Sequence, residues 1–348
     1  MRTILVTGGM GFIGSNLIRF LLQTHADLRI VNLDKLTYAG NPRNLEDVTA
    51  TPDLAGRYRF IQADICDRTA VHEAMAGCWG VVHLAAETHV DRSIVDWQQF
   101  IETEVSGTVT LLDAARQAGI QRFLHVSSDE VYGDIPAGER SSEGDPSRPR
   151  SPYAAAKAAA EQFCFAFHAT YGVPVLISRA SNTIGPNQHL EKAVPLFATN
   201  ALLDKPLPIY GDGRQVRDWL FVFDHCRALD LLLQEGTPGA VYNVGAGNEA
   251  TNLEVAEGIL ALLGKPLSLI QHIGDRQGHD RRYALDSSKI GRLGWRPGAS
   301  FEAALAATVL WYRDNLDWWQ SVRDRKFETY YESHYGERLA AAKSSTEC

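Results

Sequence analysis

Short apolar runs alternate with amphipathic stretches through the first half of this chain. Six of the runs have the length and residue types of strands, and they span Ile4–Thr7, Ile30–Leu33, Arg59–Ile61, Val81–Leu84, Phe123–Val126 and Val173–Ser178. The stretches between them have the spacing of amphipathic helices. Because each crossover helix covers one face of the sheet, this alternation predicts an α/β fold with a doubly wound parallel sheet.

The pattern changes after about Arg179, where a smaller α/β lobe begins. Prolines interrupt the short elements that follow, at Pro186, Pro195, Pro206 and Pro208. The turn Gly211-Asp212-Gly213 separates two strand-like runs. Helical patterns return at Phe223–Gln234, Leu253–Leu263 and Phe301–Leu316.

These patterns predict how the chain is divided. The large sheet domain comprises residues 1–179 with a return near 214–246, and the lobe comprises residues 180–213 and 247–330. Residues 331–348 form a C-terminal tail. From Leu339 to Cys348 the residues are small and polar enough to fray.

The composition is that of a globular protein with a large core. Of 348 residues, 45% are hydrophobic and 22% are charged. Subtracting 42 acidic from 34 basic residues gives a net charge of −8. Because basic residues are outnumbered and scattered among acidic ones, we expect no nucleic-acid partner.

The cysteines predict reduced thiols. They are odd in number and widely spaced, at Cys66, Cys78, Cys164, Cys226 and Cys348, with no Cys-x-x-Cys pair. The chain starts with an apolar strand and a glycine loop instead of a secretion signal, and no apolar run approaches the roughly 20 residues that span a bilayer. We therefore expect a cytoplasmic enzyme without a membrane partner.

Closely spaced glycines follow the first predicted strand. Gly8, Gly11 and Gly14 repeat every third residue, and Gly9 completes a Gly-x-Gly-x-x-Gly pattern with the last two. Between a strand and a helix, such glycines let the backbone approach a pyrophosphate at the helix N-terminus. We predict a Rossmann-type domain that binds a dinucleotide; a merely tight turn is the alternative.

An acidic residue ends the second predicted strand. Asp34 can accept hydrogen bonds from ribose hydroxyls and repel a 2′-phosphate, which favours NAD over NADP. Lys35 could soften that repulsion, and a solvated loop acid is the alternative. Asp64, at the end of the third strand, is suited either to meet the adenine edge or to cap a helix.

Tyr153 and Lys157 are four residues apart in a predicted helix. Ser151 is a suitable N-cap and Pro152 a suitable first residue, so the pair should share one helical face. A tyrosine has an ordinary pKa of about 10, and an ammonium and a nicotinamide cation would both favour its phenolate. The phenolate could take a hydroxyl proton while hydride leaves the same carbon. An ordinary exposed helical pair is the alternative.

Ser128, Asp129 and Glu130 follow the fifth predicted strand, at the carboxyl edge where parallel sheets bind ligands. Ser128 can hydrogen-bond a substrate oxygen. Alcohol dehydrogenation needs no adjacent carboxyl pair, so Asp129 and Glu130 indicate additional proton transfers. Mutual repulsion can keep one protonated as an acid while the other serves as a base. A solvated acidic loop is the alternative.

The segment from His83 to Ser93 leaves the fourth strand at the same edge. Its histidines could suggest a metal site, but His83 lies in an apolar strand and no Cys/His spacing matches one. We expect His83 to be a satisfied core histidine and no metal to be bound.

With these motifs the chain resembles the extended short-chain dehydrogenase/reductase family and, within it, most closely the dTDP-glucose 4,6-dehydratases. The resemblance runs nearly end to end. Besides the glycine loop and Tyr153/Lys157, it is carried by Leu33–Asn41, His83–Ser93, Ser128–Gly133, Pro208–Gly211, Arg217–Trp219 and Asp275–Tyr283.

The resemblance implies an NAD-dependent lyase that converts dTDP-glucose to dTDP-4-keto-6-deoxyglucose and water. Tyr153 would take the proton of the 4-hydroxyl, which Ser128 holds, as C4 gives hydride to NAD. Glu130 would remove the C5 proton and Asp129 would protonate the departing C6 hydroxyl. Hydride would then return to C6, while Lys157 supports Tyr153.

The resemblance also implies two sets of binding residues. NAD would be bound by Gly8, Gly11, Phe12, Ile13, Gly14, Asp34, Lys35, Thr37, Ala39, Gly40, Asp64, Ile65, Leu84, Ala85, Ala86, Tyr153 and Lys157. The nucleotide-sugar would be bound by Glu87, Ser128, Asn182, Lys192, Pro208, Tyr210, Arg217, Asn252, Arg276 and His279. Arginine forks suit a diphosphate and a tyrosine ring suits a base, although each arginine alone could be a surface charge.

Two segments depart from the family's pattern. Ser128 stands where threonine is usual, which keeps the hydroxyl but loosens its rotamer. Ser181-Asn182-Thr183-Ile184-Gly185 replaces Ser-Asn-Asn-Tyr-Gly and so loses an amide and a phenol beside the sugar pocket. The choice between thymidine and uridine, and the exact sugar, therefore stay open.

Two other functions are alternatives to a dehydratase, and the resemblance also has an implication for assembly. A nucleotide-sugar 4-epimerase would share NAD, Tyr153 and Lys157 but would not need Asp129 and Glu130. An NAD-sensing binding protein would not need the intact catalytic residues. The resemblance implies a homodimer whose four-helix contact uses 100–118 and 152–171 of each subunit.

Overall fold

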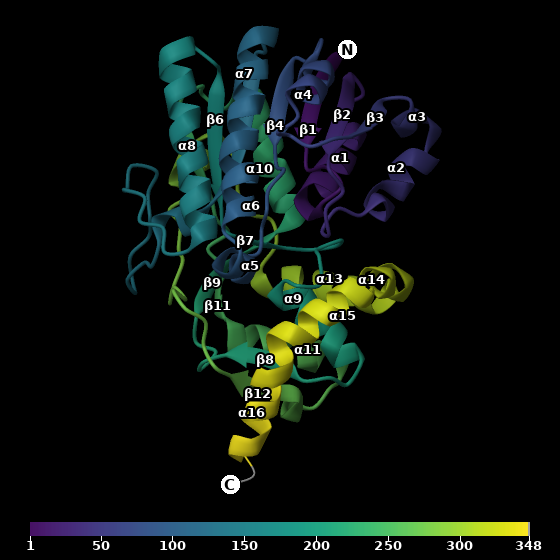
Figure 1. Cartoon of the computed structure of the whole chain (residues 1–348), viewed down its shortest axis with the longest axis vertical. Coiled ribbons are helices and arrows are strands. Elements are labelled where there is room, and N and C mark those ends of the chain that lie inside the picture. The colour runs from purple at the N-terminus through teal and green to yellow at the C-terminus, as the bar shows by residue number, and fades with distance from the viewer. Residues whose placement is uncertain (347–348) are drawn as a thin grey trace.

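The computed structural model describes residues 1–346 and contains one large parallel sheet beside a smaller lobe (Figure 1). Neighbouring strands of the large sheet are all parallel. In spatial order they are β10 (Val241–Val244), β6 (Val175–Ala180), β5 (Arg122–Ser128), β4 (Gly80–His83), β1 (Arg2–Thr7), β2 (Leu28–Asp34) and β3 (Tyr58–Gln62). The predicted doubly wound sheet is confirmed, and each of the six predicted strands lies in it.

Helices cover both faces of this sheet because successive strand side chains point to opposite sides. In β1, Ile4 and Val6 join the core on one face, whereas Leu5 joins the core on the other. The first core is covered by α1 (Phe12–Thr24), α10 (Val222–Glu235) and α12 (Ser288–Arg292). The second is covered by α4 (Arg68–Met75), α7 (Thr108–Ala118) and α8 (Pro152–Tyr171).

A long helical segment runs over the second face, where we predicted a helix over 100–118. It consists of α6 (Gln98–Phe100), the π-helix η2 (Ile101–Gly107) and α7 without a break. π-Helical turns are rare and occur frequently at functional sites. In this chain the π turn carries a buried acid, Glu104.

The lobe has its own core between two small sheets and a group of helices. One sheet orders β11 (Glu249–Thr251), β9 (Val216–Phe221) and β7 (Asn182–Ile184), and the other pairs β12 (Ile270–Ile273) with β8 (Leu207–Tyr210). Its helices are α9 (Ala193–Leu202), α11 (Asn252–Leu263), η4 (Leu267–Leu269), α13 (Phe301–Asp314) and α14 (Leu316–Val322). The predicted helix over 301–316 is thus interrupted at Asn315.

The chain passes between the two parts several times. Strand β9, inside the predicted return near 214–246, pairs with β7 in the lobe. Helix α10 and strand β10 then belong to the large sheet domain. The return therefore starts at about Val222 instead of 214.

The C-terminal residues differ from the predicted fraying tail. They form a helical segment made of α15 (Arg325–Tyr331), η5 (Glu332–Gly336) and α16 (Glu337–Thr346). It is anchored because Gln271 donates a hydrogen bond to the Leu339 carbonyl at 2.7 Å and the rings of Tyr331 and Tyr335 are buried in the lobe core. The last two residues, 347–348, lie outside the described part of the chain.

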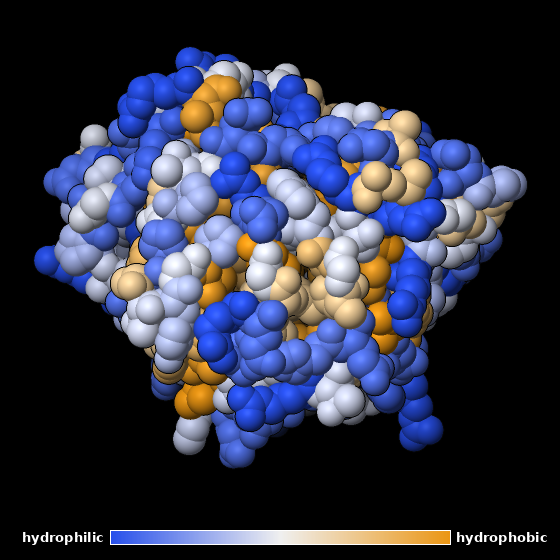
Figure 2. Space-filling view, turned by 90° about the horizontal axis from the view of Figure 1, so that it is seen from above, coloured by the Kyte–Doolittle hydropathy of each residue, from blue (hydrophilic) through white to orange (hydrophobic). Residues whose placement is uncertain are grey.

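Short helices complete the loops of the large domain: η1 (Pro42–Leu45), α2 (Glu46–Ala50), α3 (Pro52–Ala55), α5 (Val90–Val95) and η3 (Asp129–Tyr132). The surface at the amino ends of the strands is mostly hydrophilic, with smaller hydrophobic areas between (Figure 2). Within residues 1–346, no helix combines the length and apolar character needed to cross a bilayer.

Candidate active site

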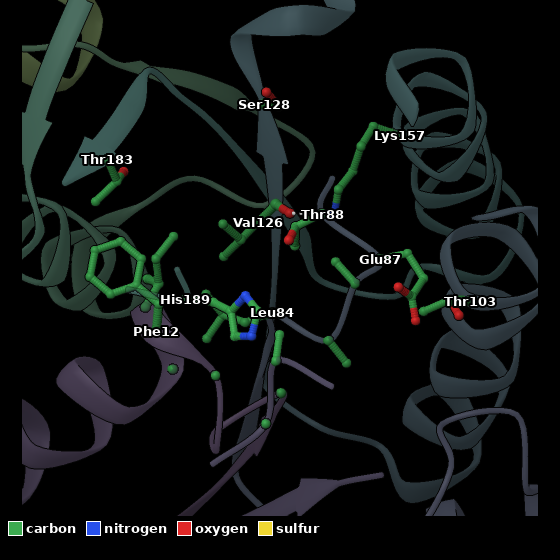
Figure 3. A pocket seen from close by; sticks show the side chains of 18 of the residues that line it. Phe12, Leu84, Glu87, Thr88, Thr103, Val126, Ser128, Lys157, Thr183 and His189 are labelled. Carbon is green, nitrogen blue, oxygen red and sulfur yellow. Dashed lines mark hydrogen bonds between the residues drawn. The ribbon is translucent and has the colours of Figure 1, made fainter. Parts of the chain in front are cut away.

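A cavity opens at the carboxyl ends of the large sheet, on the side that faces the lobe (Figure 3). Every residue of the predicted NAD set lines it, as do Ser128, Asp129 and Glu130. Residues that were not predicted also line it, among them Thr88, Thr103, Gln188, His189 and His225. Cofactor-site and reacting residues are therefore brought to one place.

The glycine loop forms one wall of this cavity at the start of α1. Gly8 has a φ of +72°, and a Cβ on it would lie 2.6 Å from the Ala85 backbone nitrogen. A Cβ on Gly14 would lie 2.3 Å from the Gly8 carbonyl oxygen. The N-cap of α1, Gly11, offers no side chain, and the first turn holds no acid. The bare N-terminus of this helix fits a pyrophosphate.

Asp34 and Lys35 line the part of the cavity where the adenosine ribose of a dinucleotide would be recognised. The Asp34 carboxylate accepts hydrogen bonds from the Met10 and Leu36 amides at 2.9 and 2.8 Å. Burial raises its pKa despite these bonds. Lys35 pairs with Asp64 at 2.6 Å, and Asp67 is the residue that caps α4. The residues present therefore fit NAD, because Asp34 stays close to the cavity while the Lys35 charge is engaged by Asp64.

Tyr153 and Lys157 lie in the first two turns of α8. The predicted cap is confirmed, because Ser151 Oγ accepts a hydrogen bond from the Ala154 amide at 3.1 Å and Pro152 is the first residue. Lys157 Nζ lies 2.8 Å from the Glu104 carboxylate and donates to the Val126 carbonyl at 3.4 Å.

The surroundings of Tyr153 in this structure favour its neutral phenol form. Burial, followed by the charges of Glu130 and Glu104, raises the pKa of Tyr153 well above its ordinary value. The Lys157 ammonium, which would favour the phenolate, is paired with Glu104. The stabilisation of the Tyr153 phenolate by Lys157 together with a nicotinamide cation stays a prediction.

Sequence reasoning missed Glu104, although a signal was present. The buried positions of this helical segment include Phe100, Glu104, Thr108 and Leu111, so the acid falls on the apolar stripe. A charge at such a position indicates a buried partner. Lys157, 53 positions later in the sequence, could be identified only from the structure.

The Ser128 triplet forms the start of the 3₁₀ turn η3. Ser128 Oγ accepts a hydrogen bond from the Glu130 amide at 3.2 Å and donates to Asp129 Oδ1 at 3.3 Å. The other Asp129 oxygen is buried without a hydrogen-bond partner. Burial, and then the Glu130 charge, raise the pKa of Asp129 well above its ordinary value.

Glu130 has a different environment from its neighbour. Burial raises its pKa too, but the positive charges of Arg276, Arg217 and Lys192 oppose that rise. The two adjacent carboxyl groups therefore have unequal surroundings. The Glu130 charge is the largest charge effect on Asp129, whereas Glu130 faces three cations. This arrangement separates an acid from a base.

The predicted nucleotide-sugar residues fall into two groups. Glu87, Ser128, Asn182 and Lys192 line the cavity itself. Burial and the nearby Glu104 and Glu191 charges raise the pKa of Glu87 to about 7. The remaining six, Pro208, Tyr210, Arg217, Asn252, Arg276 and His279, lie in the lobe outside the cavity lining.

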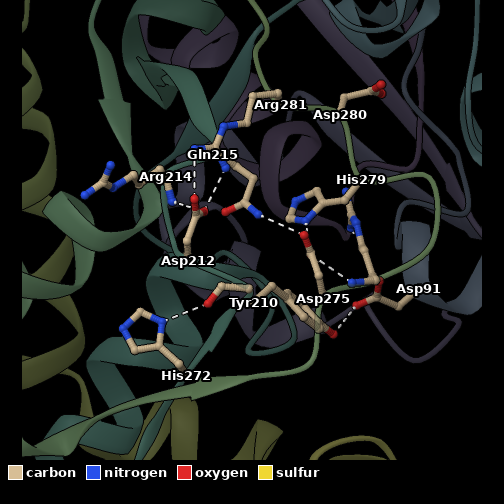
Figure 4. A network of polar contacts seen from close by, with 12 residues as sticks. Asp91, Tyr210, Asp212, Arg214, Gln215, His272, Asp275, His279, Asp280 and Arg281 are labelled. Atoms are coloured by element: carbon tan, nitrogen blue, oxygen red, sulfur yellow. Dashed lines mark hydrogen bonds and ion pairs between the residues drawn. The ribbon is translucent and has the colours of Figure 1, made fainter.

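A polar network connects several of these lobe residues (Figure 4). Tyr210 donates a hydrogen bond to Asp91 at 3.0 Å, and Arg276 Nη1 lies 3.4 Å from the other Asp91 oxygen. His279 Nδ1 lies 2.6 Å from Asp275. The guanidinium of Arg217 donates to the Val216 and Asp280 carbonyls at 2.8 and 3.0 Å.

The C-terminal segment enters this network through His334, which was not predicted. Its Nε2 lies 2.6 Å from the Tyr210 hydroxyl and 3.3 Å from Asp91. Although burial alone would raise the pKa of Asp91, the His334 hydrogen bond and nearby cations hold it well below its usual range. Residues that we assigned to a tail therefore belong to the site's surroundings.

A second contact that was not predicted lies outside the lining of this cavity. Arg92 lies between the rings of Tyr38 and Tyr330, 4.1 Å from each centroid, and pairs with buried Glu191 at 2.9 Å. Glu191 and Tyr38 are also hydrogen-bonded at 2.9 Å. This cluster ties the loop after β2 to the loop after β4.

The second departure from the family's pattern, at Thr183 and Ile184, has a clear structural setting. Thr183 lines the cavity, and its hydroxyl contacts His225 Nδ1 at 3.0 Å. Ile184 is buried in the lobe core and does not line the cavity. His83 is a satisfied core histidine, as predicted, because its two nitrogens lie 2.8 and 3.0 Å from the Thr7 and Thr108 hydroxyls.

Comparisons with known proteins agree with this site. The family model described as GDP-mannose 4,6 dehydratase matches residues 5–308. A protein from Actinoplanes sp. strain SE50/110 named dTDP-glucose 4,6-dehydratase is 49% identical, over 91% of this chain and 99% of its own. The crystal structure of a dTDP-glucose 4,6-dehydratase from Streptomyces venezuelae, with NAD and TYD bound, is 48% identical with a TM-score of 0.88, covering 92% of this chain and 99% of the other.

A related enzyme of a different activity also has this fold. A UDP-glucose 4-epimerase from Thermus thermophilus, solved with NAD, is 32% identical with a TM-score of 0.83 and covers 90% of this chain and 99% of its own. The fold alone therefore does not separate a dehydratase from an epimerase.

Proposed function

Because the chain belongs to the GDP-mannose 4,6 dehydratase family, we propose that it is an NAD-dependent dTDP-glucose 4,6-dehydratase. It converts dTDP-glucose to dTDP-4-keto-6-deoxyglucose and water. NAD, held by the glycine loop and Asp34, supplies a hydride acceptor for C4 of the sugar and gives the hydride back to C6.

The residues of this chain supply the proton transfers. Tyr153 takes the proton from the 4-hydroxyl, and Ser128 hydrogen-bonds the same oxygen. The resulting ketone makes the C5 proton acidic, and Glu130 removes it as a general base. Asp129 gives a proton to the C6 hydroxyl, which leaves as water, and the protonated Glu130 returns its proton to C5 when hydride is added at C6.

The observation that carries this proposal is the unequal environment of Asp129 and Glu130. Asp129 has one buried oxygen without a hydrogen-bond partner, and burial raises its pKa well above the usual value, which favours its protonated form. Burial raises the pKa of Glu130 as well, but the charges of Arg276, Arg217 and Lys192 oppose that rise and favour its carboxylate form. These unequal surroundings favour Asp129 as the acid and Glu130 as the base, the two roles that water elimination across C5 and C6 requires.

Incubation with sugar nucleotides tests the proposal. Purified protein is given dTDP-glucose and UDP-glucose in parallel, without added NAD, and products are analysed by mass spectrometry. We expect loss of one water molecule from dTDP-glucose, and the UDP-glucose arm measures the base preference. Epimerised sugar of unchanged mass would instead identify a 4-epimerase, and the absence of any product would favour an NAD-sensing binding protein.

We also propose that two chains associate through the helical segment of α6, η2 and α7 together with α8. Both segments leave large apolar side chains exposed: Ile101 is 46% exposed, Phe163 41% and Tyr171 55%. Exposed apolar side chains on neighbouring helices suit a helix-to-helix contact. Light scattering measures the mass in solution, and a monomer at micromolar concentration would contradict this proposal.

The compartment that we propose is the cytoplasm. The described cysteines, Cys66, Cys78, Cys164 and Cys226, are free thiols, which a reducing compartment maintains. Fractionation of the source cells, followed by immunodetection, checks this assignment.

A further inference from the structure

Glu104 is a fully buried acid that the proposed mechanism does not use. Its exposed fraction is 0%, and it lies in the π turn η2 beside the cavity. Thr103, the residue before it, lines the cavity next to Glu87, and Lys157 enters the same space from α8 (Figure 3). A buried charge is costly unless it is paired, so its position calls for a physical explanation.

Each oxygen of the Glu104 carboxylate has a partner from a different element. One lies 2.8 Å from Lys157 Nζ on α8. The other accepts a hydrogen bond from the Glu87 backbone amide at 2.9 Å, in the loop that follows β4. Glu104 thereby joins a helix that carries two reacting residues to a loop that lines the cavity.

The pair is largely shielded from water, although Lys157 lines the cavity. The side chain of Lys157 is 6% exposed and that of Glu104 is 0% exposed. Screening by solvent is weak in such surroundings, so the negative charge of Glu104 offsets most of the positive charge of Lys157 at nearby groups. Tyr153, one helical turn before Lys157, is the nearest reacting group on α8.

We propose that Glu104 is a positioning residue of the reaction: it fixes Lys157 and the loop at Glu87, and it neutralises the ammonium so that Tyr153 stays protonated until the cavity is loaded. This inference rests on the proposed function. In the empty protein Lys157 alone does not turn Tyr153 into a base. The positive charge that oxidised NAD carries on its nicotinamide ring would then favour the phenolate only when cofactor is present.

Other charged and titratable groups face this pair from the elements packed around it. Glu130 and Asp129 of η3 face Tyr153, and the Glu130 charge opposes the phenolate. Glu87 faces Glu104 from the loop after β4. His83 of β4 and His125 of β5 are near Lys157, and burial lowers the pKa of both, so they are uncharged. Lys157 is therefore the cation that Glu104 directly offsets.

The substitution Glu104→Gln tests the effect of the Glu104 charge while leaving the side chain's position unchanged. A glutamine has the same shape and its carbonyl oxygen can still accept the bond from the Glu87 amide, but it leaves the Lys157 charge without a counter-charge. The matched control is Glu161→Gln. Glu161 lies one turn after Lys157 on α8 and is also 0% exposed. It pairs at 2.6 Å with Arg179, a cation of β6 that does not line the cavity.

Two measurements test the proposal. The first is the pH profile of kcat, in which E104Q should move the acid limb to lower pH by about one unit, a tenfold change in the ionisation constant. The second needs no activity: the phenolate absorbance of each protein, without cofactor, is compared with that of its Tyr153→Phe counterpart. Tyr153 should ionise at lower pH in E104Q, whereas E161Q should match the wild type in both measurements.

A second variant covers the case in which E104Q does not fold. The double variant Glu104→Gln with Lys157→Gln leaves no unpaired buried charge. If the pair is electrically neutral toward Tyr153, the tyrosine in this double variant should titrate close to the wild-type pH. A much higher titration pH would mean that Glu104 does not offset Lys157, and the proposal would be wrong.

The outcomes separate this inference from the proposed function. Identical acid limbs and identical tyrosine titrations in wild type and E104Q overturn the role of Glu104. A wild-type protein without any product from sugar nucleotides overturns the dehydratase assignment, yet the tyrosine titration still tests Glu104.

Discussion

The Tyr210 hydroxyl donates a hydrogen bond to Asp91 at 3.0 Å, which joins strand β8 of the lobe to helix α5 of the large domain. Arg276 and His334 contact the same carboxylate at 3.4 and 3.3 Å. Three side chains from the lobe and the C-terminal segment thus converge on one acid. Binding of a nucleotide-sugar between the two parts would depend on this convergence.

Arg276→Lys should raise the KM for dTDP-glucose more than it lowers kcat. Lysine keeps the charge but lacks the planar donor fork that suits a diphosphate, so we expect about a tenfold to hundredfold rise in KM. Steady-state kinetics measure it. Arg281→Lys is the control, because Arg281 is exposed and pairs with Asp212 in the same region. Equal effects of both substitutions would contradict a diphosphate role for Arg276.

Asp129→Asn combined with Glu130→Gln should abolish water loss while leaving partial cofactor reduction by the substrate. Tyr153 and Ser128 remain for the first oxidation, but the acid and the base for elimination are gone, which costs roughly 10²–10⁴-fold for each transfer. Product mass and the absorbance of reduced NAD report the two steps separately. The exposed Glu139→Gln serves as a control. Full turnover of the double variant would refute the assigned roles.

Asp34→Asn should weaken NAD binding. The carboxylate accepts two backbone amides and lines the cavity. Losing a charge-assisted hydrogen bond costs about 1.5–3 kcal/mol, or roughly tenfold to hundredfold in affinity. NAD titration of cofactor-free protein measures the change. Asp27→Asn, at a side chain that is 60% exposed, should leave the affinity unaltered.

Glu87 should make the wild-type protein less stable as pH rises. Its pKa is about 7 in the folded protein, with burial as the largest cause, against an ordinary value of 4.5. Between these values the folded state binds more protons than the unfolded state, so its contribution to the free energy of unfolding falls as pH rises through this window.

Glu87→Gln should remove that loss. Between pH 5 and pH 8 the free energy of unfolding of wild type should fall by about 2 kcal/mol or less relative to this variant. Urea unfolding at both pH values measures it, with the exposed Glu73→Gln as the control. Parallel pH dependence of wild type and Glu87→Gln would show that the carboxyl group has an ordinary pKa.

The features that the sequence predicted correctly are local ones. The six strands follow from short apolar runs, and the glycine loop follows from spacing within seven residues, because each signal lies within one element and its neighbours. The Ser151 cap is local in the same way. Such signals need no knowledge of which distant segments meet.

The features that the sequence did not predict depend on distant contacts. Glu104 and Lys157 meet across two helices, and His334 reaches Asp91 from far along the chain. Local polarity suggested fraying from Leu339 to Cys348, but residues 339–346 belong to helix α16 and the Leu339 carbonyl accepts a hydrogen bond from Gln271. The sequence around either residue of such a pair does not identify the distant residue that it contacts.

The repeated passage of the chain between sheet and lobe has a consequence for folding. Strand β10 completes the edge of the large sheet only after the chain has built β7, α9, β8 and β9 elsewhere. Neither part can therefore be cut out as a continuous fragment, and a protease nick in the lobe should release the sheet's edge strand as well. Heat or denaturant should accordingly melt both parts in one cooperative transition.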